Sequence, residues 1–308
     1  MATTKPSRNG QETTPKPSAR GGKVLVPAVK NTPIRPIRSI VLDSGNDHWI
    51  NRLLMATPTR GLVRIEWHSA VRGMMVPPNH AMVTMIQHIN AFFPTRFSVA
   101  DAQNLAVREA IERDFEWLLL LEDDVCPPVD MLLRLDNYIK AGPPVVSGLY
   151  YTKSAPSEPL VYRGRGTGPY INWKMGQKVW CDGVPTGCLL IHMGLLRAMW
   201  EDSKQYVIPV SNQVTREVFE SPARAWISPT GDVNVTTGTS DLNWCDRVME
   251  GNYLKKSGWG QYARKRYPFL VDTSIRCGHV APDGTMYLPP DPVKVEPLRG
   301  ERGVIVKN

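Results

Sequence analysis

The feature that most constrains the fold is an apolar run at residues 115–121, which stops abruptly at three acidic residues, Glu122, Asp123 and Asp124. Six of the seven residues in the run are apolar or aromatic, and they do not alternate with polar residues. A run of this kind is typical of a strand that is covered on both faces within a parallel sheet. We therefore expect the buried central strand of an α/β domain, with the acidic cluster at its carboxyl end.

Strand-like and helix-like segments alternate along most of the chain, in the order expected for a doubly wound sheet. Besides the apolar run, strands or strand-like apolar segments are expected at residues 39–42, 62–67, 96–99, 144–151, 178–180, 187–192 and 269–273. Helices are expected at residues 79–93, 101–113, 129–140 and 241–250. Residues 201–238 have little periodicity and are expected to form a long loop region. The predicted fold class is therefore α/β, with a mostly parallel central sheet flanked by helices.

The positive charge of the chain is concentrated in its first 38 residues. The full sequence has 37 basic and 29 acidic residues, a formal net charge of +8. Residues 1–38 contain eight of the basic residues and one of the acidic ones, which leaves 29 basic and 28 acidic residues in the rest of the chain. This tail is rich in Pro, Thr, Ser and Gly and poor in large apolar residues, so we expect it to be disordered. The basicity therefore belongs to the tail.

Neither the cysteines nor the hydropathy of the sequence indicates a secreted or membrane-spanning protein. The five cysteines form an odd set without a CxxC pair, which argues against a disulfide framework and a zinc ribbon and favours reduced structural thiols. No run of about 18 apolar residues is available to span a bilayer, and the tail lacks the apolar core of a signal peptide. The expectation is a soluble cytoplasmic protein.

Three adjacent carboxylates at a strand end need a compensating positive charge. They repel one another, and each costs several kcal/mol to remove from water if it has no partner. In open parallel sheets, ligands bind beyond the carboxyl ends of the strands, which is where Glu122, Asp123 and Asp124 are expected. Oxygen ligands suit Mg²⁺ or Mn²⁺, and Mg²⁺ is commonly held by one or two carboxylates together with substrate phosphates. A solvated acidic turn is the alternative interpretation of the same residues.

The longer string around this cluster, WLLLLEDDVCPPVDML at residues 117–132, resembles the DxD-motif region of GT-A glycosyltransferases. The likeness is to the family 2-like enzymes common in phages and bacteria in particular. Further segments resemble later parts of these enzymes in the expected order, at residues 146–151, 184–191, 239–244 and 277–279. The resemblance implies a Rossmann-like GT-A domain. Its expected limits are a tail at 1–38, a nucleotide-sugar-binding half at 39–151, an acceptor-binding and catalytic half at 152–290, and a C-terminal extension at 291–308.

The resemblance implies a metal-dependent enzyme that transfers a hexose from a nucleotide sugar, a UDP-sugar by the family pattern, to a hydroxyl acceptor with inversion. Asp124 would be the principal ligand of Mn²⁺ or Mg²⁺, His279 a second ligand, and Glu122 would face the metal or the donor ribose. Asp241 would be the general base that takes the proton of the acceptor hydroxyl. The residues matched to donor contacts are Glu122, Asp123, His68, Ser69, Gln103, Asn104 and Gly187, and those matched to acceptor contacts are Trp180 and Asp182.

The sequence departs from the family pattern at three places. Glu122 stands where Asp is commoner, and its longer side chain reaches the ribose differently. Gln103-Asn104 stands where relatives often have Arg-Asn, and an uncharged Gln103 cannot neutralise a phosphate. Residues 67–69 replace a proline-containing turn.

Two of the matched residues also have purely structural interpretations. Asp241, or Ser240 before it, would suit the N-cap of the helix that follows. His279 could be a polar residue at a strand end. The sequence leaves these alternatives open.

Other functions fit parts of the sequence. One version of the transferase glycosylates hydroxymethylated pyrimidines in DNA, with the basic tail attracting the phosphate backbone. A sugar-phosphate nucleotidyltransferase also uses acidic metal ligands on an α/β sheet, but residues 71–75 match its expected Gly-rich basic loop poorly. A non-catalytic glycan- or nucleic-acid-binding module is suggested by the departures above and by nine tryptophans, with Trp173, Trp180 and Trp226 in the irregular half. If a phage encodes the chain, the host cytoplasm is the expected location.

Overall fold

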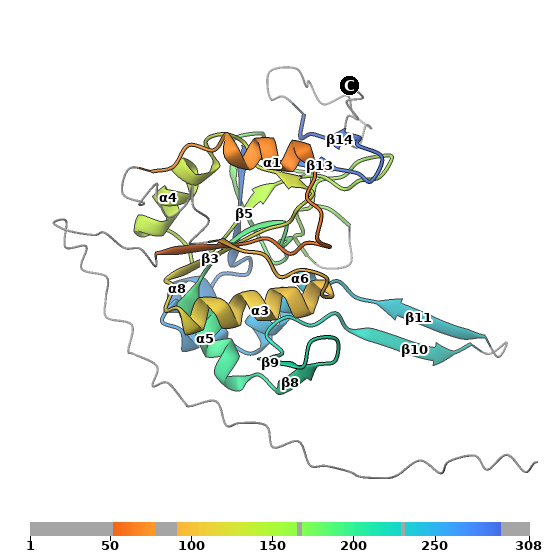
Figure 1. Cartoon of the computed structure of the whole chain (residues 1–308). Helices are drawn as coiled ribbons and strands as arrows, with labels where there is room; N and C mark the ends of the chain where they lie inside the picture. The colour runs from red at the N-terminus through yellow and green to blue at the C-terminus, as the bar shows by residue number, and fades with distance from the viewer. Residues whose placement is uncertain (1–51, 78–90, 165–167, 229–231, 291–308) are drawn as a thin grey trace, which may run out of the picture. The chain divides into compact units, whose positions relative to one another are not determined.

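The apolar run forms strand β3, Trp117–Leu121, and all five of its residues are buried. β3 belongs to a seven-stranded sheet with the order β2-β1-β3-β7-β5-β12-β6 (Figure 1). The other strands are β2 (Ala91–Phe92), β1 (Leu53–Ala56), β7 (Cys188–His192), β5 (Val145–Leu149), β12 (Phe269–Arg276) and β6 (Lys178–Cys181). This computed structural model describes residues 52–77, 91–164, 168–228 and 232–290, which all lie in one compact unit.

Five of the seven strands of this sheet run in the same direction. β1 is parallel to β2 and to β3, and β12 is parallel to β5. β7 is antiparallel to both β3 and β5, and β6 is antiparallel to β12. The predicted mostly parallel sheet is therefore confirmed, but its middle position is taken by the antiparallel β7 and not by β3.

Helices cover both faces of the sheet, as predicted (Figure 1). Those on one face are α3 (Val99–Glu112), α5 (Met193–Asp202) and α6 (Ser240–Glu250), and those on the other are α1 (Ile65–Arg72) and α4 (Met131–Ala141). Successive side chains of β3 alternate between the two cores, with Leu118 and Leu120 in the first and Trp117 and Leu119 in the second. Burial on both faces explains why this strand is a continuous apolar run in the sequence.

The region expected to be a long loop forms two antiparallel hairpins instead. β8 (Gln205–Ile208) pairs with β9 (Gln213–Arg216), and β10 (Ala223–Ile227) pairs with β11 (Val233–Thr237). The prediction fails because short, half-exposed strands such as β8 and β9 lack the apolar alternation that marks a buried strand. The hairpin of β10 and β11 extends away from the main sheet (Figure 1).

Two strands expected before the apolar run are wrong. Residues 62–67 contain the start of α1, in which a single residue is buried, so their apolar side chains do not mark a strand. Residues 96–99 form a turn and a helix start. Arg96 has a φ of 67°, and Ser98 caps α3 by accepting a hydrogen bond from the N–H of Asp101 (3.2 Å). The strand that the structure has before α1 is β1, and all four of its residues are buried.

The other expected elements that can be compared lie close to their predicted positions, as α3, α4, α6, β5, β6, β7 and β12. Of the helix expected at 79–93, residues 91–92 form β2, because they pair with β1, and the rest lies outside the described residues. The strand at 39–42, the tail and the C-terminal extension also lie outside them. All five cysteines are buried and free of disulfides. No described helix is long and apolar enough to cross a membrane.

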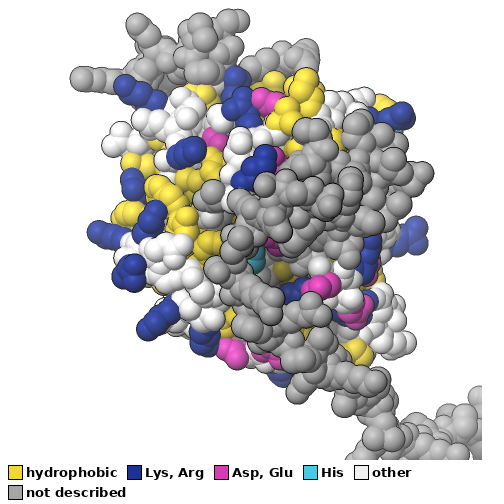
Figure 2. Space-filling view, turned by 90° about the vertical axis from the view of Figure 1, so that its left-hand side faces the viewer, with side chains coloured by type: hydrophobic (Ala, Val, Ile, Leu, Met, Phe, Trp, Pro, Cys, Tyr) yellow, Lys and Arg dark blue, Asp and Glu magenta, His cyan; other side chains and the backbone are white. Residues whose placement is uncertain are grey.

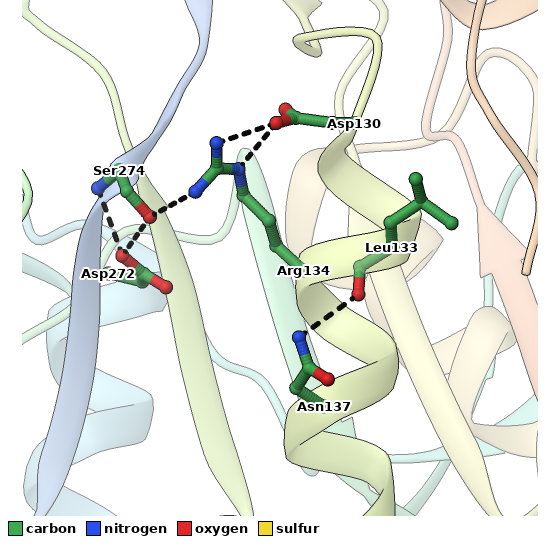
Figure 3. A network of polar contacts seen from close by, with 6 residues as sticks. All are labelled: Asp130, Leu133, Arg134, Asn137, Asp272 and Ser274. Carbon is green, nitrogen blue, oxygen red and sulfur yellow. Dashed lines mark hydrogen bonds and ion pairs between the residues drawn. The ribbon is translucent and has the colours of Figure 1, made fainter.

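A buried carboxylate ties α4 to β12 (Figure 3). Asp272 is 5% exposed and accepts hydrogen bonds from the hydroxyl of Tyr138 (2.7 Å) and from the N–H (2.9 Å) and hydroxyl (2.6 Å) of Ser274. The Ser274 oxygen in turn accepts from Arg134 (3.0 Å), whose guanidinium pairs with Asp130. An unpartnered buried carboxylate would cost several kcal/mol, so these donors explain how Asp272 is tolerated where the pairing of β12 with β5 becomes irregular.

His192 makes the stability of the fold depend on pH. It caps α5 through Nδ1, which accepts a hydrogen bond from the N–H of Gly194 (3.0 Å), and its ring meets Trp117 and Trp259 edge-on. Burial, and then the charge of Arg197, lowers the pKa of His192 from 6.5 to about 4. Because the unfolded chain takes up this proton first, the stabilising contribution is complete above pH 6.5 and is lost as the pH falls toward 4.

From this shift we expect a loss of about 2 kcal/mol between pH 7.5 and pH 5. Urea denaturation of the wild-type protein and of His192→Asn at both pH values measures it. Asn keeps a capping acceptor but does not titrate in this range, so the difference in stability between the two proteins should shrink at pH 5. An equal difference at both pH values would mean that His192 is not the titrating group.

Candidate active site

The acidic cluster forms a tight turn directly after β3. The N–H of Glu122 donates to the carbonyl of Gly187 (3.0 Å), and the N–H of Val125 donates back to the carbonyl of Glu122 (3.1 Å). A hydrogen bond from Thr59 lowers the pKa of Asp123, although burial outweighs it and raises this pKa. The turn leads into β4 (Val125–Cys126). This strand forms a small three-stranded sheet with two strands from late in the chain, β13 (Gly278–Val280) and β14 (Met286–Tyr287).

The small sheet brings His279 to the acidic turn. β13 pairs with β4 so that His279 lies opposite Val125. The N–H of Val280 donates to the carbonyl of Asp124 (2.8 Å). The Nδ1 atom of His279 lies 2.6 Å from the carbonyl oxygen of Tyr151, which can only accept, so Nδ1 carries a hydrogen. Nε2 lies 3.7 Å from Oδ1 of Asp124. In the neutral ring Nε2 is also an acceptor, so the pair can share a cation, a proton or a water molecule that donates to both atoms.

Asp124 is ionised and held by two basic side chains. Its other carboxylate oxygen is contacted by Nζ of Lys153. Burial would raise the pKa of Asp124, but the contacts with His279 and Lys153 together outweigh it and lower the pKa from 3.8 to about 2. The sequence resemblance does not single out Lys153. Its position just after the segment 144–151 was the available signal, because residues that follow a strand in this direction share the carboxyl edge of the sheet.

Glu122 is held in a buried chain of hydrogen bonds. The hydroxyl of Thr186 donates to Oε1 of Glu122 (3.1 Å), and the side-chain amide of Gln103 donates to the oxygen of Thr186 (3.0 Å). Burial, followed by the charges of Asp124 and Asp241, raises the pKa of Glu122 from 4.5 to about 7. Gln103 is fully buried, so it acts on Glu122 through Thr186 and does not present its side chain to a donor at the surface. Thr186 is a further residue that the sequence did not single out.

Asp241 lies in the first turn of α6 and close to the acidic turn. The N-cap of α6 is Thr239, so neither Asp241 nor Ser240 caps the helix. The carboxylate of Asp241 is half-buried and accepts a hydrogen bond from the N–H of the next residue (2.8 Å). Its negative charge raises the pKa of both Glu122 and Tyr150, so these three side chains share one electrostatic environment.

Gly187 leaves room for Tyr150 beneath the acidic turn. The N–H of Gly187 donates to the hydroxyl oxygen of Tyr150 (2.7 Å), and the Tyr150 ring meets the His279 ring edge-on with 5.1 Å between centroids. A Cβ atom at position 187 would lie 2.4 Å from this hydroxyl oxygen and 2.8 Å from Cγ2 of Val125. Both neighbours are buried, so neither can move aside easily.

Gly187→Ala is therefore expected to destabilise the protein by about 1–3 kcal/mol, the usual cost of overpacking a core. Urea denaturation followed by circular dichroism measures the change. Gly260→Ala is the matched control, because a Cβ at that position meets nothing within 4 Å. Equal stability of the two variants would contradict the close packing around Tyr150.

Three residues matched to donor contacts lie in other surroundings. His68 and Ser69 are in the middle of α1 on its exposed side, because the expected strand and turn form a helix here. Asn104 is 1% exposed, and its amide group donates to the carbonyl of Phe219 (2.8 Å) and the hydroxyl of Tyr206 (3.0 Å). Its oxygen accepts from the N–H of Phe219 (2.7 Å). Asn104 thus fastens α3 to the chain after β9, and its side chain is not available to a donor.

The two residues matched to acceptor contacts lie at the edge strand β6. Trp180 stacks on Tyr262 with 5.7 Å between ring centroids, and Nζ of Lys265 lies 3.3 Å from the centre of the Trp180 ring. Both carboxylate oxygens of Asp182 accept from the N–H of Gly164, at 3.1 and 3.0 Å.

Asp124 and His279 are the two side chains that fit a divalent cation at the acidic turn. One supplies an anionic oxygen, and the other a ring nitrogen whose partner Nδ1–H is bound to a backbone carbonyl, which is typical of metal-bound histidines. Within the described residues, no group of three or more His, Cys, Asp or Glu side chains is arranged to hold a metal. The carboxylate of Glu122 is instead turned to Thr186. Two protein ligands completed by substrate phosphates are common for Mg²⁺.

Comparison with known proteins does not assign this chain to a family. No protein-family model and no curated protein matches the sequence. Among solved structures, the chain is similar to A197 from STIV at 17% identity and a TM-score of 0.45, over 78% of this chain and 95% of that one. It is also similar to S. aureus TarS 1–349 in complex with UDP, at 12% identity and a TM-score of 0.30, and spans 50% of each chain. At these values the likeness carries no inference about activity.

Proposed function

We propose that this chain is a metal-dependent glycosyltransferase that moves a hexose from a nucleotide sugar to a hydroxyl acceptor, with inversion at the sugar. The observation that carries the proposal is the pairing of Asp124 with His279, whose Nε2 faces the carboxylate while Nδ1–H is bound to Tyr151. A divalent cation is one group that can bridge these two side chains. The pair also lies at the carboxyl edge of the sheet, where phosphate-bearing ligands of such folds bind.

In this proposal some residues stabilise the leaving group and another activates the acceptor. Asp124 and His279 would hold Mn²⁺ or Mg²⁺, which offsets the charge that develops on the diphosphate leaving group. Asp241 would take the proton of the acceptor hydroxyl as its oxygen attacks the anomeric carbon, because an unassisted hydroxyl is a poor nucleophile. The bond to the diphosphate breaks as the glycosidic bond forms, and a single displacement inverts the anomeric configuration.

The donor and acceptor are proposed on the sequence resemblance and on the chemistry of the turn. Glu122, Asp123 and Gly187 would line the donor side, and a UDP-sugar is the first candidate donor. Lys153, which neutralises Asp124, supplies a second cation near the same edge for a diphosphate. The hydroxyl of a hydroxymethylated pyrimidine in DNA is the first candidate acceptor.

A screen of sugar nucleotides with Mn²⁺ and with Mg²⁺, followed by release of nucleoside diphosphate, tests this function. Release that requires the divalent cation is expected, and faster release with hydroxymethylated DNA would identify the acceptor. Exchange of pyrophosphate into the sugar nucleotide, without release of nucleoside diphosphate, would identify a sugar-phosphate nucleotidyltransferase instead. Binding of a nucleotide sugar or of nucleic acid without either reaction would identify a non-catalytic binding module.

A further inference from the structure

The charge of residues 39–308 is unevenly distributed, although its net value is close to zero. Residues 251–268, which contain the short helices α7 (Tyr253–Lys256) and α8 (Gly260–Ala263), include five basic residues and no acidic one. The exposed cations here and along β6 are Lys174, Lys178, Lys255, Lys256, Arg264, Lys265 and Arg266. Figure 2 shows Lys and Arg side chains along the left-hand margin of one face, with few Asp or Glu among them.

Aromatic rings hold some of these cations in place. Nζ of Lys265 lies 3.3 Å from the centre of the Trp180 ring, and Nζ of Lys178 lies 5.1 Å from the centre of the Tyr138 ring. Trp180 is itself stacked on Tyr262, and Nζ of Lys265 also lies 5.0 Å from the centre of the Tyr262 ring, so this cation contacts both rings. Contacts of this kind are worth about 0.5–1 kcal/mol at exposed sites and restrict the motion of a long side chain.

Two arginines extend the same arrangement. The guanidinium of Arg163 lies 4.4 Å from the centre of the Tyr267 ring, and that of Arg266 lies 5.3 Å from it. Lys265 and Arg266 are consecutive, so the contacts on Trp180 and on Tyr267 are adjacent. We call the resulting row the basic edge, and its members are Arg163, Lys178, Lys265 and Arg266.

The cations of the basic edge have no carboxylate partners among the described residues. None of the four forms a salt bridge within the part of the chain that the structure describes, whereas Lys256 pairs with Asp202 and Lys140 with Asp136. Cations held side by side without counter-charges create a positive potential that attracts a polyanion. The basic edge is therefore a charged surface without a partner among the described residues.

We propose that the basic edge binds the sugar–phosphate backbone of a nucleic acid. Cations held at fixed positions fit regularly spaced phosphates. An anionic membrane is the other polyanionic surface to consider, and a segment that binds it usually inserts exposed apolar side chains. In the described parts of residues 163–182 and 253–268, Ile171 is the one large apolar side chain that is strongly exposed. The rings at this edge are occupied by the cations, which favours nucleic acid.

The basic edge is separate from the acidic turn. Lys265 and Arg266 precede the start of β12, whereas Glu122 follows the end of β3, and these two strands run in the same direction. Lys265 and Arg266 therefore lie toward the opposite end of the sheet strands from Glu122. Lys178 lies opposite Asp272 on the edge strand β6, which β7, β5 and β12 separate from β3. Nucleic-acid binding at the basic edge does not depend on the proposed glycosyl transfer and can be tested without a donor.

Binding of a fluorescein-labelled DNA duplex to the full chain, measured by anisotropy at several KCl concentrations, tests the proposal. The combined variant Lys178→Gln/Lys265→Gln/Arg266→Gln should bind more weakly. Its plot of log affinity against log salt should be less steep by about 2–3, because each phosphate contact contributes about 0.9 to the slope. A matched control, Arg60→Gln/Arg72→Gln/Lys204→Gln, removes the same charge from other exposed positions and should keep the wild-type slope. The basic tail is present in all three proteins and cannot account for a difference.

Several outcomes would overturn the proposal. They are a wild-type protein without salt-dependent DNA binding, an unchanged slope in the combined variant, and an equal loss in the control. Loss of binding to phosphatidylserine vesicles with DNA binding intact would point to a membrane instead. Lys265→Arg keeps the charge, and wild-type binding by this variant separates an effect of charge from an effect on packing around Trp180. Weak binding by Lys265→Arg in a protein with an unchanged melting temperature would also contradict the proposed role.

Discussion

Replacement of Asp241 by Asn is expected to lower kcat for glycosyl transfer by about 10²–10⁴-fold, the range for loss of a general base. Asn keeps the size of the side chain and its place in the first turn of α6, but it cannot take the proton of the acceptor hydroxyl. The affinity for the nucleotide sugar should change little, because the proposed role concerns the acceptor. Steady-state release of nucleoside diphosphate, with saturating donor and varied acceptor, measures the effect.

Glu250→Gln is the matched control for Asp241→Asn, since Glu250 is an exposed carboxylate at the other end of the same helix. It should retain wild-type kcat. If Asp241→Asn also retained wild-type kcat, Asp241 would not be the base. If Asp241→Asn lost donor affinity and thermal stability together, Asp241 would instead have a role in the structure of the acidic turn.

Replacement of Asp124 by Asn is expected to reduce turnover by about 10²–10³-fold, comparable to removing a main electrostatic contact to a transition state. The substitution removes the negative charge that faces His279 and Lys153, and with it the anionic ligand of the proposed cation. The concentration of Mn²⁺ needed for half-maximal activity should rise as well. Turnover measured over a Mn²⁺ titration gives both values.

Asp283→Asn is the control for this second change, because Asp283 is an exposed carboxylate in the loop after β13. It should leave both the maximal rate and the Mn²⁺ dependence unchanged. Asp124 and Lys153 are partly exposed, so the loss of activity in Asp124→Asn should come without a large loss of stability. Normal Mn²⁺ dependence in Asp124→Asn would show that another group binds the cation.

The sequence predicts best those features that lie within a short stretch of chain. The strand β3 is predictable because burial on both faces leaves a continuous apolar run, and the turn after it is marked by its acids. Helices α3, α4 and α6 are predictable for a related reason, since each has one apolar face. The prediction of a strand at the start of α1 is wrong because Ile65 is exposed and Trp67 is the one buried residue of the helix, so no continuous apolar face marks it.

The contacts between distant segments are what the sequence does not reveal. Lys153 meets Asp124, and Thr186 links Gln103 to Glu122, only because β5, β7 and α3 converge at one edge of the sheet. Apart from the position of Lys153 just after a predicted strand, these pairings leave no periodic or spaced signal in the sequence. The resemblance to glycosyltransferases named Asp124, His279 and Asp241 by their order, but it could not show that Asn104 is fully engaged in a structural contact.

Mn²⁺ binding in the presence of UDP, measured by electron paramagnetic resonance of the free ion, tests the central claim most directly. The wild-type protein is expected to bind a single Mn²⁺ per chain with nucleotide, because Asp124 and His279 supply two ligands and the diphosphate completes the set. Asp124→Asn/His279→Gln should lose this site, while Asp283→Asn should keep it. Equal stoichiometry and affinity in the wild-type protein and the double variant would contradict a cation site at the acidic turn.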